Sequence, residues 1–224
     1  MELVGVYLSP FVRRVAVALN VWEIPFDRIP ASVVDARDTI GRFNRLVRVP
    51  CLVLDDGDVL IDSHQILLEL DHLVGPDRAM TPAEPKLRRR HGQMLANLTG
   101  ALEKLVASFY ERVRRPEDKR WDAWASQCLD QAVGGLEAAE ALAGHPDGEG
   151  AAGTGQLFGP RITHADIAAV IAYEFGAVAD PARVTAASLP RLAALASRLG
   201  PTPSFASTRI GPPSADAQHG RSSR

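Results

Sequence analysis

The chain has 224 residues, of which 46% are hydrophobic, and a formal net charge of -2 at pH 7. This length and composition suffice for a packed core and exclude disorder as the default, and the near-neutral charge excludes binding driven by a strongly basic surface. No stretch reaches the roughly 18 to 20 apolar residues of a membrane span, and the N-terminus lacks a signal-peptide pattern. We therefore expect a cytoplasmic protein with no nucleic-acid and no membrane partner.

The first strand and helix follow one another closely. The stretch "ELVGVY" (residues 2–7) predicts a short buried strand. "FVRRVAVALNVW" (residues 11–22) predicts a helix, because its apolar residues recur every three or four positions. Between them, Ser9 is placed to cap the helix and Pro10 fits its first turn.

A second extended segment and a hairpin come next. "FDRIPASVV" (residues 26–34) predicts an edge strand, since its proline cannot donate to a ladder. Residues 36–46 predict a short helix or an irregular connection. Two apolar runs that flank Asp56-Gly57 predict an antiparallel hairpin over residues 50–62.

A helix after the hairpin completes the first half. Ser63 is the predicted cap of a helix over residues 64–74, which ends at Gly75. Two strand–helix pairs, a hairpin and a closing helix predict a small mixed sheet with helices packed on its faces.

From about residue 80 the apolar spacing is helical. It predicts a long amphipathic helix, a second helix over residues 121–142 and a last one over residues 189–199. Residues 144–155 have the composition of a flexible loop, and residues 212–224 that of a disordered tail.

A capping box is predicted in the helical half. In "RITHADIAAVIA" (residues 161–172), Thr163 is the predicted N-cap, Asp166 reaches back to it, and Ile162 can pack on Ile167. This pattern predicts a helix start and is structural.

Neither the cysteines nor the histidines have the spacing of a metal site. Cys51 and Cys128 are far apart in the sequence and are interpreted as small buried residues. Helix surfaces are the predicted location of four histidines: His64, His72, His91 and His164. We predict no metal.

Several motifs together resemble the cytosolic glutathione S-transferases, in particular the serine-type theta, zeta and tau classes and their bacterial relatives. They are "SPFVRRV" after the first strand, "RVP" before the hairpin, "DSHQI" after it, and "ITHADIA" and "PSFAST" in the helical half. The resemblance covers residues 1 to about 206. It implies an α/β thioredoxin-like N-terminal domain (1–77) and an all-α C-terminal helical domain (84–206). It leaves the last residues unexplained, and we predict a disordered tail there (207–224).

The resemblance gives Ser9 a catalytic role. Ser9 matches the serine whose hydroxyl donates a hydrogen bond to the glutathione sulfur. A free thiol has a pKa of about 8.5, so a donor and the positive end of a helix dipole both favour its thiolate. Tyr7 is the rival, because other classes use a tyrosine near the end of this strand. Strand alternation places Tyr7 on the face of Leu3, where a core tyrosine is the ordinary interpretation.

The resemblance also implies a glutathione site. Pro50 matches a cis-proline, although the base rate for X-Pro bonds favours trans, and the backbone of Val49 would pair with the cysteinyl unit. Arg48 either meets the glycyl carboxylate or is a solvated surface residue. Asp62 and Ser63 match the pair that binds the γ-glutamyl ammonium and carboxylate groups.

A second-substrate pocket is less sharply indicated. Phe11 is its best-placed candidate by resemblance. Phe109 and Tyr110, with Trp121 and Trp124, either line this pocket or pack in the core, and their helical spacing favours the core.

The predicted function is therefore glutathione transfer to a hydrophobic electrophile, typical of detoxification. Glutathione is a substrate, no cofactor is needed, and the resemblance implies a homodimer. A glutathione peroxidase side activity stays open, because the same activated thiolate can attack a hydroperoxide. The alternative is a non-catalytic glutathione- or ligand-binding, regulatory member of the same fold.

Overall fold

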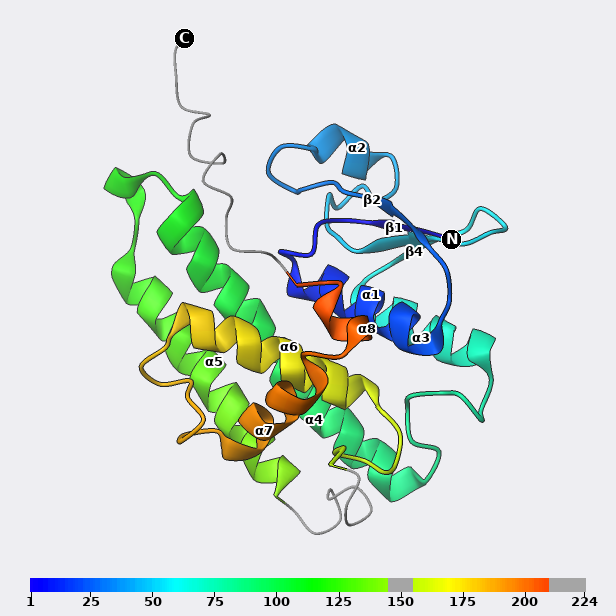
Figure 1. Cartoon of the computed structure of the whole chain (residues 1–224). Coiled ribbons are helices and arrows are strands. Elements are labelled where there is room, and N and C mark those ends of the chain that lie inside the picture. The colour runs from blue at the N-terminus through cyan, green and yellow to red at the C-terminus, as the bar shows by residue number, and fades with distance from the viewer. Residues whose placement is uncertain (145–154, 210–224) are drawn as a thin grey trace.

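The computed structural model describes residues 1–144 and 155–209 (Figure 1). Four short strands form one mixed sheet with the order β2-β1-β3-β4. β1 is parallel to β2 and antiparallel to β3, and β3 and β4 form the predicted hairpin. The strands are β1 (Glu2–Val4), β2 (Asp27–Ile29), β3 (Cys51–Val53) and β4 (Val59–Ile61).

β1 is shorter than predicted because the chain turns at Gly5. This glycine has φ +138°, a conformation that strongly favours glycine, and its N–H donates to Ile29 O at 2.9 Å. A Cβ atom at this position would lie 2.4 Å from Val12 Cγ2. The turn therefore brings the chain close against the first helix, and Tyr7 lies beyond the strand rather than on its inner face.

Three helices accompany the sheet. Figure 1 shows α1 and α3 together on the side of the sheet that faces the helical region, and α2 on the opposite side. Apolar residues of α1 and α3 are fully buried beneath the strands, among them Leu19 and Ile66. The helices are α1 (Pro10–Trp22), α2 (Arg37–Gly41) and α3 (Ser63–Val74).

The cap of α3 differs from the prediction. Asp62, with φ +69°, is the N-cap, and its carboxylate accepts a hydrogen bond from the His64 N–H at 2.8 Å. Ser63 is instead the first residue of the helix, and its hydroxyl accepts a hydrogen bond from Arg14. Aspartate and serine are equally good N-caps, so residue type alone does not determine which of these two neighbours caps the helix.

The helical region follows the predicted pattern within a few residues. α4 packs along α5 and α6, and α6 is buried on all sides from its first turn to its middle. The 3-10 turn Glu117–Lys119 (η2) precedes α5. The other elements are α4 (Pro85–Phe109), the π-helical turn η1 (Tyr110–Arg114), α5 (Asp122–Ala143), α6 (His164–Ala179), α7 (Pro190–Leu199) and α8 (Pro203–Ala206).

The packed chain extends to Arg209, three residues into the predicted tail. Thr208 is buried and its hydroxyl accepts a hydrogen bond from Arg13 Nε at 3.1 Å, while Arg209 pairs with Glu174 at 2.8 Å. These contacts tie the end of the described chain to α1 and α6. Residues 145–154 of the predicted loop and 210–224 of the predicted tail lie outside the described residues.

Two of the four histidines are buried, which corrects the prediction that all lie on helix surfaces. His91 Nε2 accepts a hydrogen bond from Ala165 N–H at 3.3 Å, and His164 Nε2 lies 3.1 Å from Asp71 Oδ2. The Asp71 carboxylate also accepts the Met80 N–H at 2.7 Å. This cluster connects α3 and the segment after it with α4 and α6, which sequence spacing alone cannot show.

We expect the buried His91 to make the fold less stable in acid. Burial lowers the pKa of His91 to about 3, whereas an exposed histidine in the unfolded chain titrates near 6.5. Between these values the unfolded chain binds a proton that the folded chain does not, so the free energy of unfolding decreases as the pH is lowered. His91 alone should account for a decrease of about 2 kcal/mol between pH 7 and pH 5. Urea unfolding at pH 7 and pH 5 measures this loss.

The control is His91→Gln, which keeps an acceptor near the Ala165 N–H and does not titrate. The variant should lose less stability between the two pH values than the wild type. An equal loss in both proteins would show that other groups cause the acid sensitivity.

Both cysteines are buried, as the sequence indicates. Burial raises the pKa of the Cys51 thiol to about 11, which keeps it protonated and unreactive at neutral pH. Neither cysteine is placed as a nucleophile.

Candidate functional site

Two cavities meet where α1 begins and β3 is about to start. The first has a volume of about 500 Å³ and the second about 530 Å³. Phe11, Arg48 and Val49 line both. The two cavities are therefore adjacent and share these three residues.

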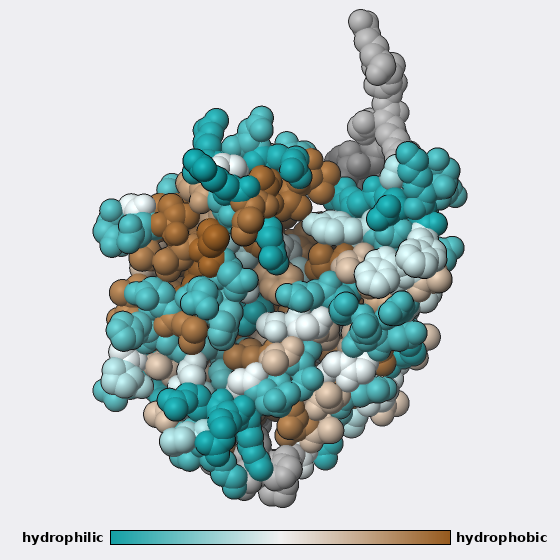
Figure 2. All heavy atoms as spheres, turned by 180° about the vertical axis from the view of Figure 1, so that it is seen from behind, coloured by the Kyte–Doolittle hydropathy of each residue, from teal (hydrophilic) through white to brown (hydrophobic). Residues whose placement is uncertain are grey.

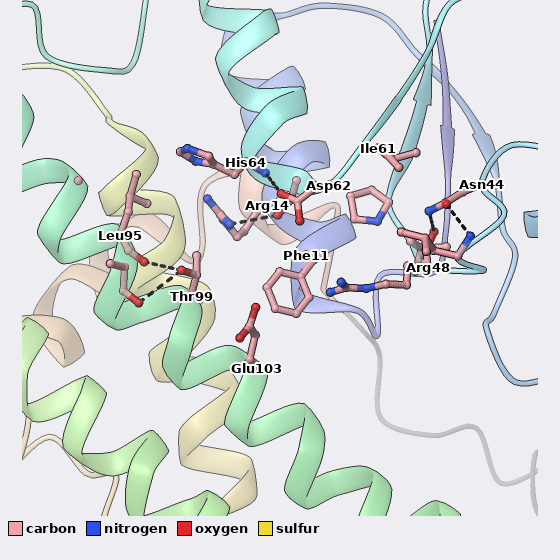
Figure 3. Close-up of a pocket in the computed structure, with 16 residues that line it drawn as sticks. Phe11, Arg14, Asn44, Arg48, Ile61, Asp62, His64, Leu95, Thr99 and Glu103 are labelled. Carbon is pink, nitrogen blue, oxygen red and sulfur yellow. Dashed lines mark hydrogen bonds between the residues drawn. The ribbon is translucent and has the colours of Figure 1, made fainter.

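The first cavity carries charges of both signs. Figure 3 shows it between α4, which presents Thr99 and Glu103, and the segments that carry Arg48 and Asp62. Ser63 and its helix N-terminus lie in the same wall. A helix N-terminus favours a negative group, and a nearby carboxylate favours a positive one. This arrangement suits a ligand that is itself zwitterionic.

Arg14 is a site residue that sequence reasoning missed. It is 1% exposed, its Nη1 donates to Ser63 Oγ at 3.1 Å, and its Nε and Nη2 have no hydrogen-bond partner within the described residues. Burial lowers its pKa to about 10, and Asp62 opposes that shift. A buried, incompletely paired cation that lines the cavity attracts an anion. The pair of arginines in "SPFVRRV" was the available signal.

The segment before β3 presents its backbone to the same cavity. The Val49-Pro50 peptide bond is cis, and Arg48 O accepts a hydrogen bond from Asn44 Nδ2 at 3.0 Å. Within the described residues, the backbone N–H and C=O of Val49 make no hydrogen bond to the protein. They are available to an extended ligand, in the manner of an unpaired strand edge.

Ser9 is the N-cap of α1 and lines the second cavity. Its Oγ accepts a long hydrogen bond of 3.4 Å from Val12 N–H, and no described residue accepts a hydrogen bond from its hydroxyl. The hydroxyl proton is thus available to a ligand atom, and the N-terminus of α1 adds a positive dipole end.

Tyr7 lines neither cavity. The Arg28 guanidinium lies over its ring, 3.7 Å from the centroid, and burial raises the pKa of its hydroxyl. A raised pKa means that the phenol holds its proton more firmly. The geometry brings Ser9, and not Tyr7, to the lining of the cavities.

The second cavity is mostly apolar and is lined by the three residues that the sequence offers as candidates for a second-substrate pocket. Phe11 comes from α1, Phe109 from the end of α4 and Tyr110 from the π-helical turn η1. Tyr110 is 41% exposed, so the core packing that its helical spacing favours is wrong.

Trp121 and Trp124 lie elsewhere. Trp121 is 65% exposed and stacks on Trp124 with ring centroids 6.4 Å apart. Neither tryptophan lines the second cavity.

The capping box of α6 lies away from the cavities and is fully buried. Asp166 Oδ2 accepts hydrogen bonds from Thr163 N–H at 2.8 Å and Thr163 Oγ1 at 2.6 Å, and Oδ1 accepts the Leu157 N–H at 2.8 Å. The Thr163 hydroxyl in turn accepts the Asp166 N–H at 3.4 Å. This box fixes where the central helix begins and contacts no ligand space.

Within residues 1–144 and 155–209, no group of three or more histidine, cysteine, aspartate or glutamate side chains is placed to hold a metal ion. A search of the same residues for a helix long and apolar enough to cross a membrane finds none.

Known proteins share this architecture and sequence pattern. A family model for the glutathione S-transferase N-terminal domain matches residues 3–78. A glutathione S-transferase from Methylobacterium radiotolerans, solved in complex with glutathione sulfonate, is 30% identical with a TM-score of 0.80, over 92% of this chain and 93% of that one. A glutathione transferase family member from Pseudomonas fluorescens with bound glutathione is 26% identical with a TM-score of 0.74, over 94% and 98% of the two chains.

A curated relative adds a partial match. The uncharacterized GST-like protein YibF of Escherichia coli is 35% identical over 116 residues. That match spans 51% of this chain and 56% of YibF, little more than half the relative's length. Since the model of the N-terminal domain and a relative aligned over nearly its full length agree with the thioredoxin-like sheet and the helical region, the chain belongs to the glutathione S-transferase family.

Proposed function

We propose that the chain is a serine-type glutathione transferase. Glutathione binds in the first cavity, and its sulfur attacks an electrophile held in the second. The observation that carries this proposal is the meeting of a mixed-charge cavity and an apolar cavity at Phe11 and Val49, with Ser9 in the wall.

Each part of glutathione finds a chemical match in the first cavity. Its γ-glutamyl carboxylate suits Ser63 and the buried Arg14, and the ammonium group suits Asp62. The open backbone of Val49 can pair with the cysteinyl unit. Arg48, which lines both cavities, suits the glycyl carboxylate. Glutathione is then a substrate, and the reaction needs no further cofactor.

The proposed chemistry is activation of a nucleophile. The Ser9 hydroxyl donates a hydrogen bond to the sulfur and stabilises the thiolate, with help from the α1 dipole. The thiolate forms a carbon–sulfur bond as the leaving group departs with its electron pair, and the thiol proton goes to water. The relative from Methylobacterium radiotolerans was solved with glutathione sulfonate, which carries negative charge where glutathione has its thiol.

The test separates binding from turnover. We expect the protein to bind immobilised glutathione, to be eluted by free glutathione, and to conjugate glutathione to 1-chloro-2,4-dinitrobenzene above the uncatalysed rate. Binding without conjugation would favour the non-catalytic alternative. Failure to bind glutathione at all would contradict the transferase proposal and leave the alternative of a member that binds another ligand.

We also propose that two copies associate. Figure 2 shows apolar side chains gathered over part of one face. The sheet, α3 and the loop before β3 expose several large apolar residues: Leu46, Val59, Ile61, Leu68 and Leu73. Exposed apolar side chains concentrated in one part of a fold are typical of an interface with another protein.

A further inference from the structure

The two cavities differ in the sign of their charges. The first is lined by cations and by two acids, Asp62 and Glu103. The second is lined by Arg37, Arg48 and Arg114, and none of the acidic residues in 1–144 and 155–209 lines it. Within this part of the chain, the charged side chains around the apolar cavity proposed for the electrophile are therefore all positive.

These positive charges are not neutralised within the described chain. Arg37, Arg48 and Arg114 form no ion pair with any residue of 1–144 or 155–209. The acids next to Arg37 in sequence, Asp35 and Asp38, are exposed and do not line the cavity.

Arg114 lies near an aromatic ring of the cavity wall. Its guanidinium lies 5.8 Å from the centroid of the Phe109 ring, which also lines the cavity. The acid nearest to it in η1, Glu111, is buried and already accepts hydrogen bonds from Arg115 Nε at 2.8 Å and Trp121 N–H at 2.7 Å. Glu111 therefore fixes the turn that carries Arg114 and leaves the Arg114 charge free to act on a ligand.

We propose that the second cavity selects electrophiles that carry a carboxylate, or an equivalent anionic group, on an apolar body. This inference rests on the proposed transferase function. A thiolate and an anionic electrophile repel one another, so an uncharged pocket would disfavour such a substrate. Arg37 and Arg114, which stay unpaired when Arg48 binds the glycyl carboxylate of glutathione, offset that repulsion and attract the anion, while the aromatic side chains hold the apolar body.

A suitable probe is 4-chloro-3,5-dinitrobenzoate, with its methyl ester as the neutral partner. In both, the glutathione sulfur bonds to the ring carbon that carries chlorine, chloride leaves with the electron pair, and the thiol proton goes to water. Each kcat/KM is divided by the uncatalysed rate constant of the same compound, which removes the difference in intrinsic reactivity. We expect the carboxylate to be favoured by about 10-fold, since each exposed charge pair contributes up to about fivefold.

The variant Arg37→Gln/Arg114→Gln should lower this carboxylate-to-ester ratio by about 10-fold. Arg48 is left unchanged because it also lines the first cavity. The matched control is Arg42→Gln, which removes an exposed arginine at the end of α2 that lines neither cavity, and which should leave the ratio unchanged. Added salt should reduce the ratio in the wild type more than in the double variant. A wild type with no preference, or a preference that survives in the double variant, would overturn the proposal.

A binding measurement keeps this inference separate from the proposed function. Calorimetry with S-(4-carboxybenzyl)glutathione and S-benzylglutathione requires no turnover. If the carboxylated compound binds more tightly and this preference is lost in the double variant, the anion preference is supported. Should neither electrophile be conjugated in that case, only the transferase proposal fails. Equal affinities in the wild type would overturn the anion preference even if conjugation is rapid.

Discussion

Replacing Ser9 with alanine is expected to lower kcat/KM for conjugation by about 10²- to 10³-fold, the usual cost of losing one preorganised donor to a developing or full negative charge. The affinity for glutathione should change little, because the groups proposed to bind its two ends lie at Ser63, Arg14 and Arg48. Steady-state kinetics and calorimetry with glutathione measure the two effects independently.

The thiolate itself can be observed. In the wild type, the ultraviolet absorbance of the thiolate of bound glutathione should appear well below the free-thiol pKa of about 8.5. In Ser9→Ala the titration should move back towards that value. A titration that stays low in the variant would assign the stabilisation to the α1 dipole or another donor.

Tyr7→Phe is the matched control for Ser9. It removes the rival hydroxyl and keeps the ring that Arg28 covers. We expect its kcat/KM to remain close to that of the wild type, because Tyr7 lines neither cavity. If Tyr7→Phe loses activity and Ser9→Ala keeps it, the chain belongs to the tyrosine-type classes.

Replacing Asp166 with alanine is expected to lower the free energy of unfolding by about 3 to 5 kcal/mol. The substitution leaves the buried N–H groups of Leu157 and Thr163 without their acceptor, and each unsatisfied buried donor costs about 1 to 3 kcal/mol. It also removes the Asp166 half of the capping box of α6, the helix at the centre of the helical region, and leaves only the Thr163 hydroxyl as its cap. Urea unfolding at pH 7 measures the change.

Asp130→Ala is the control for this prediction. Asp130 on α5 forms an exposed ion pair with Arg183, and such pairs contribute less than about 1 kcal/mol. Thr163→Ala should fall between the two, since Asp166 keeps two of its donors. A loss in Asp166→Ala no larger than that in Asp130→Ala would show that water replaces the carboxylate at this position.

Local patterns predicted the elements of the fold well. The hairpin around Asp56-Gly57, the edge strand and the long helices depend on turn chemistry and apolar periodicity, which adjacent residues determine. The edge strand β2 stops before Pro30 and is shorter than the predicted residues 26–34, because proline cannot donate to a ladder. The capping box of α6 is likewise a four-residue signal. The errors arose where two neighbouring residues serve one role equally well, as with Asp62 and Ser63, or where a glycine ends a strand early, as Gly5 does.

The sequence could not show which distant residues lie together. Arg14 is three residues beyond Phe11, yet its partner Ser63 belongs to another helix, and only their contact reveals a buried cation at the first cavity. His91 and His164 were predicted on helix surfaces although His91 lies in the apolar stripe of α4, and the packing of α4 against α6 buries both. Arg37 and Arg114 come from opposite halves of the chain and meet at one cavity.

By itself, the sequence therefore determined the order of strands and helices, the helix start at Ser9 and, through its motifs, the family. These features are encoded by neighbours along the chain, whose propensities and capping groups act within one or two turns. The tertiary structure decided that Ser9 and not Tyr7 lines the second cavity, that Arg14 is buried and incompletely paired, and that the charged residues lining the second cavity, among those the structure describes, are all arginines. Burial and the net charge of a cavity depend on groups that only packing brings together, so no local pattern can encode them.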